Sequence, residues 1–291
     1  MAESPSSSKS HLDLVGNYFD QNAGEWSDLY RRVQRVNDIV LADRKNAAVE
    51  QLALRLPPGG RILDAGCGAG LAALDLARRG FFVHGFDVAP KMLELARKNL
   101  TENQIAADRF ALSCGDVASA TPPASSFDGV AALGFLQYQP DERVALREFH
   151  RVLKPGGVIV ITGPTRIKLS NYLGLSRTYY ALRSKLRRKP AARPAVAREA
   201  APAGAQASST RAVLRQISPH AYSYGRFQEL LDSTGFRVLL RKGHGFVNFE
   251  IIGKRLGFRG EMCLHRLFSK LAKVLPIGRF ANDIIVVAEK V

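Results

Sequence analysis

The sequence has few cysteines, no long hydrophobic run and no apolar leader, and each absence excludes a class of protein. Its three cysteines, Cys67, Cys114 and Cys263, show no metal-ligand spacing, which argues against a disulfide framework and a zinc site and favours a reducing compartment. No segment approaches the roughly 20 apolar residues of a membrane span, and the first residues lack the features of a signal peptide. We therefore expect a soluble, cytoplasmic protein without a bound metal.

Acidic residues are scarce in one part of the chain. The whole sequence has 42 Lys and Arg against 26 Asp and Glu, a net charge of +16. Between residues 163 and 280 there are 23 basic residues and 5 acidic ones, whereas the rest of the chain has 19 and 21. A nearly neutral body thus carries a basic C-terminal portion, and the two require separate explanations.

Apolar periodicity and glycine-rich turns divide the chain into parts. Strands alternate with helices of about 10 to 15 residues from Arg61 to Pro164, and two further strands are predicted over 236–242 and 283–290, which indicates an α/β fold with a doubly wound, mostly parallel sheet. The predicted parts are a disordered tail (1–10), an N-terminal helical lid (11–58), a core (59–164), a basic insertion after the fifth strand (165–221, with a flexible linker at about 190–212) and the C-terminal part of the core (222–291, with an amphipathic helical segment at 249–275).

A glycine-rich loop follows the first predicted strand. Glycines at alternate positions, Gly66, Gly68 and Gly70, let the backbone approach a ligand closely, and the helix that follows points its N-terminal amides at the same place. A dinucleotide fingerprint needs its third small residue at Leu71, so NAD is not favoured. Asp87 ends the second predicted strand, where a carboxylate accepts hydrogen bonds from ribose hydroxyls.

Five ordered segments resemble the motifs of the class I S-adenosylmethionine-dependent methyltransferases. They are RILDAGCGAG, VHGFDVAPKMLELAR, GDV, SFDGVAALGFLQYQPD and REFHRVLKPGGVIVI, and they span roughly residues 60–163. The sequence is similar in particular to small-molecule enzymes such as the quinone and magnesium-protoporphyrin methyltransferases. The resemblance implies a seven-stranded Rossmann-like sheet with a helical lid, S-adenosylmethionine as cofactor and S-adenosylhomocysteine as product.

The resemblance also implies which residues bind the cofactor. The glycines would cradle its methionine moiety and ribose, Asp64 would orient its amino group, Asp87 would hold the ribose hydroxyls, and Asp116 would accept the adenine amino group. The implied cofactor-binding residues are Asp64, Gly66, Gly68, Gly70, Asp87, Val88, Met92, Asp116, Val117, Leu133 and Gly134. For Val88, Met92 and Leu133, ordinary core packing is an equally good interpretation.

Acceptor-side residues are harder to identify, because related enzymes often have a histidine where Gln137 and Tyr138 stand in this chain. A general base is needed only if the acceptor carries a proton, as a hydroxyl does. The candidates for contact with the acceptor are Tyr18, Trp26, Gln137 and Tyr138, and those for catalysis are Tyr30 and His220, with His244 as a further candidate. The alternatives are packing of the lid for the tyrosines and a solvated loop for the histidines.

The segment after the fourth predicted strand reads ALGFLQYQ, without the D/N-P-P-Y/F motif of enzymes that methylate base amines or glutamine amides. The basic portion leaves three hypotheses. The first is methyl transfer to a hydrophobic or lipid-linked small molecule, with the cations on an anionic membrane surface. The others are an RNA methyltransferase and a non-catalytic cofactor-binding protein. We favour the first, with a hydroxyl oxygen as acceptor.

Overall fold

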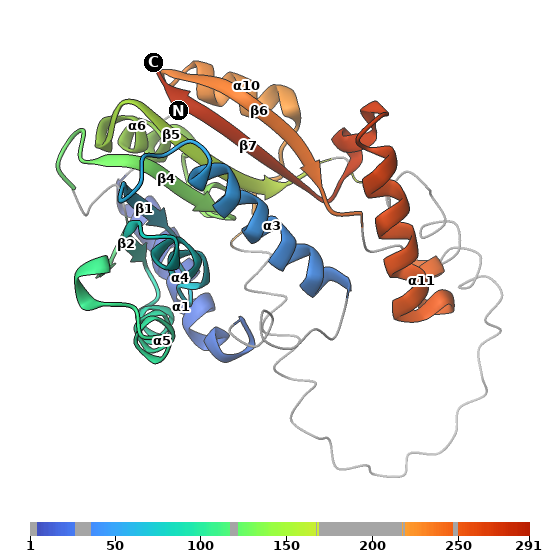
Figure 1. Cartoon of the computed structure of the whole chain (residues 1–291), viewed down its shortest axis with the longest axis horizontal. Helices are drawn as coiled ribbons and strands as arrows, with labels where there is room; N and C mark the ends of the chain where they lie inside the picture. The colour runs from blue at the N-terminus through green and yellow to red at the C-terminus, as the bar shows by residue number, and fades with distance from the viewer. Residues whose placement is uncertain are drawn as a thin grey trace, which may run out of the picture.

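The computed structural model describes residues 5–26, 36–116, 122–166, 168, 217, 219–246 and 250–291. Seven strands form a sheet in the order β3, β2, β1, β4, β5, β7, β6 (Figure 1). Neighbours from β3 to β5 are parallel, while β7 is antiparallel to both β5 and β6. The bounds are β1 Arg61–Ala65, β2 Phe82–Asp87, β3 Phe110–Cys114, β4 Phe127–Leu133, β5 Leu153–Pro164, β6 Phe236–His244 and β7 Asp283–Lys290.

This sheet confirms the predicted α/β fold and its mostly parallel, seven-stranded arrangement. The central strands are apolar over most of their length because helices cover both of their faces. β5 begins at Leu153, ahead of the apolar run that starts at Val158, because Leu153 already pairs with Phe127 before the register shifts between Phe127 and Gly129.

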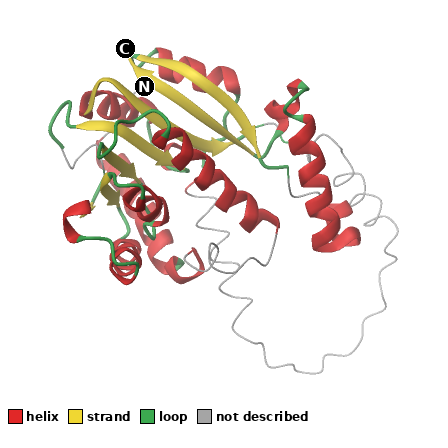
Figure 2. Ribbon diagram, viewed as in Figure 1, coloured by secondary structure: helices red, strands yellow, loops and turns green. Residues whose placement is uncertain are grey.

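Helices cover both faces of the sheet (Figure 2). α3 and α4 pack on one face through a cluster that includes Leu52 and Leu76, and α6 and α10 pack on the other through Phe149 and Phe227. The bounds are α3 Val36–Ala53, α4 Leu71–Arg78, α5 Pro90–Glu102, α6 Glu142–Val152 and α10 Tyr224–Asp232, with short 3-10 turns η1 Ala107–Arg109, η2 Leu136–Tyr138 and η3 Pro276–Phe280.

The first helix, α1 Pro5–Gln21, is fastened to α5. The carboxylate of Asp20 accepts a hydrogen bond of 2.9 Å from the backbone N–H of Lys91, in the first turn of α5. Residues 5–10 form the start of α1, which corrects the prediction that they belong to a disordered tail. Pro5 suits the first helical position, because the N–H that it lacks has no partner within a helix there.

Most of the predicted insertion, 165–221, lies outside the described residues. The points where it leaves and rejoins the fold are adjacent, since Thr165 bridges to Tyr222 and the backbone N–H of Arg166 donates to the carbonyl of Tyr222 at 2.8 Å. Beyond it, α11 Glu250–Leu271 lies within the predicted helical segment and is kinked at Gly257. Of the helices described, none combines the length and hydropathy needed to cross a membrane.

Candidate active site

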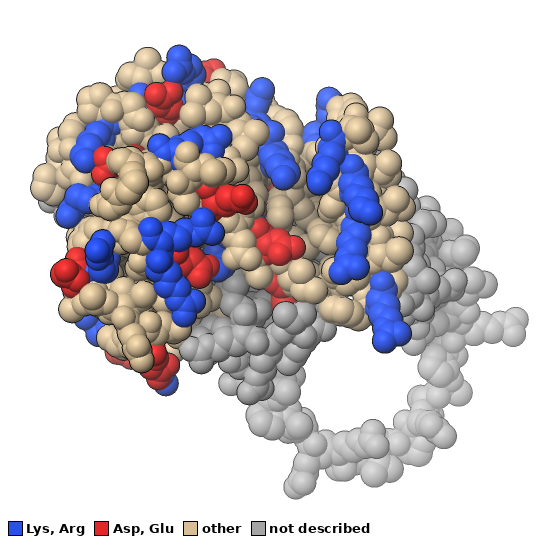
Figure 3. Space-filling view, in the orientation of Figure 1, with Lys and Arg blue, Asp and Glu red and all other residues tan. Residues whose placement is uncertain are grey.

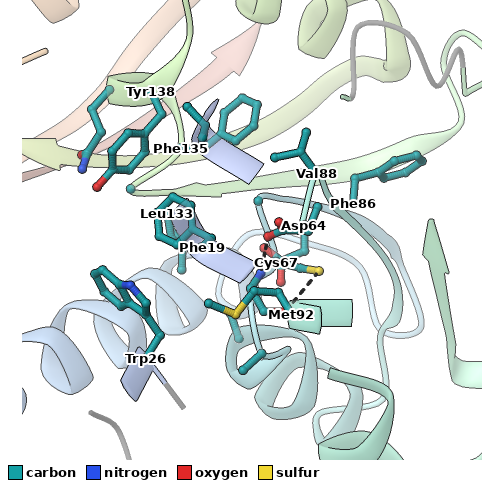
Figure 4. A pocket seen from close by; sticks show the side chains of 18 of the residues that line it. Phe19, Trp26, Asp64, Cys67, Phe86, Val88, Met92, Leu133, Phe135 and Tyr138 are labelled. Carbon is teal, nitrogen blue, oxygen red and sulfur yellow. Dashed lines mark hydrogen bonds between the residues drawn. The ribbon is translucent and has the colours of Figure 1, made fainter. Parts of the chain in front are cut away.

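A pocket opens at the carboxyl ends of β1, β2 and β4. At this point the strand order reverses, because β2 and β3 lie on one side of β1 and β4 and β5 lie on the other. Ligands of open α/β sheets bind at such a switch point. Seen from close by (Figure 4), aromatic rings from α1 and from the segment after β4 face the end of β1. The lining residues are Leu12, Val15, Phe19, Trp26, Arg44, Lys45, Asp64, Gly66, Cys67, Gly68, Ala69, Leu71, Ala72, Phe86, Asp87, Val88, Met92, Gly115, Leu133, Gly134, Phe135, Gln137, Tyr138 and Gln139.

The glycine loop turns tightly at the floor of this pocket. Gly66, Gly68 and Gly70 all have positive φ, at 67°, 52° and 73°, a conformation that side chains disfavour. Gly66 and Gly68, two of the predicted cofactor-binding residues, line the pocket. Gly70, the third glycine of the loop, is not among the lining residues. A Cβ on Gly70 would lie 2.8 Å from the Cβ of Ala96, so this glycine is needed for α4 to pack against α5.

Asp87 lies at the end of β2 and is held by the loop. Its Oδ2 accepts a hydrogen bond of 2.8 Å from the backbone N–H of Gly68, and its Oδ1 accepts one of 2.9 Å from that of Ala89. Burial raises the pKa of this carboxyl, although the two backbone hydrogen bonds oppose the rise. The predicted ribose-binding carboxylate therefore also fixes the shape of the glycine loop.

Asp64 is the second carboxylate of the site and is 2% exposed. Burial, followed by the nearby charge of Asp87, raises its pKa from 3.8 to about 7, while a hydrogen bond from the backbone of Ala73 acts in the opposite direction. Its Oδ2 has no hydrogen-bond partner in the described part of the chain. A buried carboxylate with an unsatisfied oxygen, close enough to the half-buried Asp87 to feel its charge, forms a site for a positively charged group.

Cys67 lies between these carboxylates in the loop but is not a candidate nucleophile. Burial and the charges of Asp64 and Asp87 raise the pKa of its thiol well above the usual range. Its sulfur fits against Gly85, where a Cβ would come within 2.9 Å of it. The residue therefore fills space behind the loop.

One wall of the pocket combines α1 with the start of α5. Val88 and Met92 line it, as predicted, and so does Gly115 at the end of β3. Asp116 follows directly but is not among the lining residues, and Val117 lies outside the described residues. Phe19 of α1, which the sequence analysis missed, and Trp26, which follows α1 and is a predicted acceptor contact, both line the pocket.

Tyr18, a predicted acceptor contact, is not among the residues that line the pocket. It packs on Val15 and Ile217, and its ring meets that of Phe19 edge to face at 5.2 Å. Successive residues of a helix point about 100° apart, so Phe19 occupies the direction that we had assigned to its neighbour. Tyr30, a predicted catalytic residue, lies outside the described residues.

Another wall is formed by Leu133 and Gly134, which the resemblance assigns to the cofactor, and by Gln137 and Tyr138, which are predicted acceptor contacts. Sequence reasoning missed two cations there that come from α3. Arg44 bonds Asp283 at 3.1 Å and reaches within 3.6 Å of the position of a Cβ on Gly134, and Lys45 pairs with Asp75. No sequence signal identifies them, since only the fold brings α3 to β4 and β7.

The two candidate histidines lie in different places. His220 does not line the pocket, but its backbone N–H donates to the carbonyl of the lining residue Gln137 at 2.9 Å. Its Nδ1 lies 2.8 Å from Oε1 of Glu142. His244 ends β6, and its Nε2 lies 3.1 Å from the carbonyl of Val40, under α3, so it does not face the acceptor side.

Comparison with known proteins identifies similar sequences over the core. Residues 63–161 match the family described as methyltransferase domain. A ubiquinone biosynthesis O-methyltransferase from Xanthomonas campestris pv. campestris (strain B100) is 33% identical over 126 residues, which are 43% of this chain and 52% of that protein. The chain thus spans about half the length of the curated relatives that it matches.

Solved structures extend the likeness to nearly the whole chain. Magnesium protoporphyrin IX methyltransferase from Synechocystis PCC 6803, with bound S-adenosylhomocysteine, has a TM-score of 0.61 at 15% identity, covering 96% of this chain and 99% of that chain. The [4+2]-cyclase SpnF has a TM-score of 0.58 at 18% identity, covering 95% of each chain. At such identities the likeness shows the fold alone, and a cyclase shares it.

Proposed function

We propose that this chain, whose residues 63–161 match the methyltransferase-domain family, transfers the methyl group of S-adenosylmethionine to a hydroxyl oxygen of a small, hydrophobic or lipid-linked molecule. The observation that carries the proposal is the pair of carboxylates at the glycine loop of the pocket, the buried Asp64 and the half-buried Asp87. Each part of the cofactor finds a suitable group in the lining.

The charged and polar groups of the pocket support this cofactor. Its ammonium matches the unsatisfied oxygen of Asp64, and its ribose hydroxyls match Asp87. The carboxylate of the cofactor's methionine moiety would pair with the cation of Arg44. The adenine would pack against the apolar side chains of Val88 and Met92. Bound there, the cofactor supplies an activated methyl group, and the protein's task is to align an acceptor with it.

The nature of the acceptor follows from the other wall. Phe19, Trp26, Phe135 and Tyr138 line the pocket together, and Phe19 meets the ring of Tyr138 edge to face at 5.3 Å, which favours an acceptor with a hydrophobic, flat portion. The similar ubiquinone biosynthesis O-methyltransferase supports a small molecule with a hydroxyl group. Methyl transfer to a hydroxyl depends mainly on position and on removal of one proton.

We also propose that α11 rests on the anionic inner face of a membrane, where a lipid-linked acceptor would be found. Figure 3 shows a row of basic side chains along α11. Arg259, Arg266 and Lys270 line a surface groove together with Phe258 and Leu267, which are 45% and 50% exposed. Each cation near an anionic surface contributes about 1 kcal/mol.

Calorimetry with S-adenosylhomocysteine tests the cofactor site. Asp87→Asn should weaken binding about 10-fold to 100-fold, because a charged hydrogen bond contributes roughly 1.5–3 kcal/mol. Asp108→Asn, on an exposed 3-10 turn, is the matched control and should bind as the parent does. Binding that persists unchanged in Asp87→Asn would refute the assigned ribose site.

Transfer from radiolabelled S-adenosylmethionine to a panel of hydroxylated aromatic compounds separates the enzyme from a non-catalytic binding protein. Incorporation of label into an organic product supports the proposal. Tight binding of S-adenosylhomocysteine without transfer to any member of the panel would overturn it in favour of a binding protein.

Co-sedimentation with phosphatidylglycerol vesicles tests the membrane contact. The double charge reversal Arg266→Glu with Lys270→Glu should abolish binding, whereas Arg97→Glu with Lys98→Glu, the same change on exposed positions of α5, should not. Retention on RNA at matched salt, without vesicle binding, would contradict the membrane proposal and favour an RNA methyltransferase.

A further inference from the structure

Four polar side chains gather where α6 begins, beside the acceptor wall. The carboxylate of Glu142 lies at their centre and is buried. His220 Nδ1 lies 2.8 Å from its Oε1, and Arg226 Nη2 lies 3.6 Å from its Oε2. Burial, and then the charge of Glu142, raises the pKa of the Tyr222 hydroxyl, which is the fourth member.

Backbone hydrogen bonds place this cluster next to the pocket. The N–H of His220 donates to the carbonyl of Gln137 at 2.9 Å, and Tyr222 is tied to Pro164 in the same way at 2.8 Å. Gln137 lines the pocket on its acceptor side. The backbone of His220 is thus fixed beside a lining residue of the acceptor side, while its imidazole contacts Glu142 and 44% of its side chain is exposed.

The carboxylate determines which ring nitrogen can accept a proton. A histidine bound to a carboxylate through Nδ1 carries its hydrogen there, and its Nε2 is left with a lone pair. Glu142 is in turn held by Arg226, which also bonds Glu229 at 3.1 Å, so the carboxylate stays in place. The arrangement is that of an oriented base.

The neighbouring groups are poor proton acceptors. Burial raises the pKa of both Tyr138 and Tyr222, so each phenol stays protonated at neutral pH. His11 Nε2 lies 3.1 Å from the carbonyl of Tyr138, so the other nitrogen of this ring keeps a lone pair, but the partner of the ring is a neutral carbonyl. The carboxylate of Glu142 stabilises the imidazolium that His220 would become, which makes His220 the better oriented base of the two.

We propose that His220, oriented by Glu142, is the general base for the acceptor hydroxyl; this inference rests on the proposed function. As the oxygen forms its bond to the methyl carbon, the carbon–sulfur bond breaks and its electron pair stays on sulfur. The hydroxyl proton passes to Nε2 of His220 and then to solvent. Glu142 is a positioning residue, because it acts through the imidazole.

Two acceptors of different acidity test the base. A catechol must lose a proton during transfer, whereas a thiophenol is already ionised at neutral pH. His220→Gln should lower kcat/KM for the catechol about 100-fold or more, and it should leave transfer to the thiophenol and the affinity for S-adenosylhomocysteine nearly unchanged. The matched control is His84→Gln, on β2 outside the pocket lining, where His84 bonds Ser113.

A second measurement does not depend on activity. The nitrogen-15 chemical shifts of the His220 ring at neutral pH report its tautomer, and the hydrogen should lie on Nδ1. Glu142→Gln retains an acceptor oxygen and should keep this tautomer, whereas Glu142→Ala should lose it together with transfer to the catechol.

The outcomes separate the two proposals. A parent protein that binds S-adenosylhomocysteine but methylates neither acceptor contradicts the proposed function, and the base assignment falls with it. Transfer to the catechol that survives His220→Gln, or a hydrogen found on Nε2 in the parent protein, overturns the base assignment alone.

Discussion

Replacing Asp64 by Asn should stabilise the unliganded protein and weaken its cofactor binding. In the folded chain the pKa of this carboxyl is about 7, against an ordinary value of 3.8, because it is buried and lies near Asp87. At pH values between 3.8 and about 7, Asp64 keeps its proton in the folded protein but releases it in the unfolded chain. The native state therefore loses stability as the pH rises from about 4 to 7, and the loss is constant above the folded pKa.

The magnitude follows from the size of the shift. Each pH unit in this window costs about 1.4 kcal/mol, so the advantage of Asp64→Asn over the parent should grow by about 3 kcal/mol between pH 5 and pH 7. For a chain of this size that is roughly 6 °C or more in Tm. Asparagine resembles the protonated carboxyl in shape and hydrogen bonding, so the other contributions largely cancel.

The assay is thermal unfolding of both proteins at several pH values, combined with calorimetry of S-adenosylhomocysteine binding. The variant should gain stability over the parent with rising pH and should bind the ligand at least 10-fold more weakly, because the partner of the ammonium loses its charge. A Tm difference that does not change between pH 5 and pH 8 would refute the raised pKa. Undiminished binding would refute the role of Asp64.

Three further predictions concern the same pocket. Gly70→Ala should lower the free energy of unfolding by about 2–4 kcal/mol, because the positive φ and the contact of the new Cβ with Ala96 are both unfavourable. Gly68→Ala, whose Cβ meets nothing within 4 Å, should cost about 1 kcal/mol and mainly reduce ligand affinity. Urea unfolding and calorimetry distinguish the two variants. Binding of S-adenosylhomocysteine at pH 7 should release roughly half a proton, because the ligand's ammonium lowers the raised pKa of Asp64. The release is measured as a dependence of the binding enthalpy on the ionisation enthalpy of the buffer. A binding enthalpy of the parent protein that is the same in all buffers would contradict this prediction. Trp26, the single tryptophan, lines the pocket, so its fluorescence should change on binding with the Kd found by calorimetry, and an unchanged spectrum would argue against closure of α1 over the ligand.

The fold and the cofactor side of the pocket were largely predictable because their signals are local. Strands, helix ends and the glycine loop are encoded in neighbouring residues, and the positions of Asp64, Asp87, Val88 and Met92 follow from where each strand ends. The family match over residues 63–161 confirms the resemblance on which their roles were assigned. Gly70 differs because its neighbour Ala96 comes from another helix.

The acceptor side was harder to predict, because it is assembled from segments far apart in the sequence. Arg44 reaches it from α3, and Phe19 rather than Tyr18 faces it because of the rotation of α1. The contact of His220 with Glu142 joins residues 78 positions apart, and no spacing rule predicts it.

The sequence by itself determined the succession of strands and helices, the glycine loop and the carboxylates that follow two strands, since hydrophobic periodicity and glycine placement act over a few residues. It also determined that the positive charge belongs to the C-terminal portion. Only the tertiary structure decided which side chains meet: Asp64 beside Asp87, Arg44 beside Gly134, and His220 on Glu142. The physical reason is that pKa values, hydrogen bonds and pocket walls depend on distances in space, which the chain sets only when its distant segments pack together.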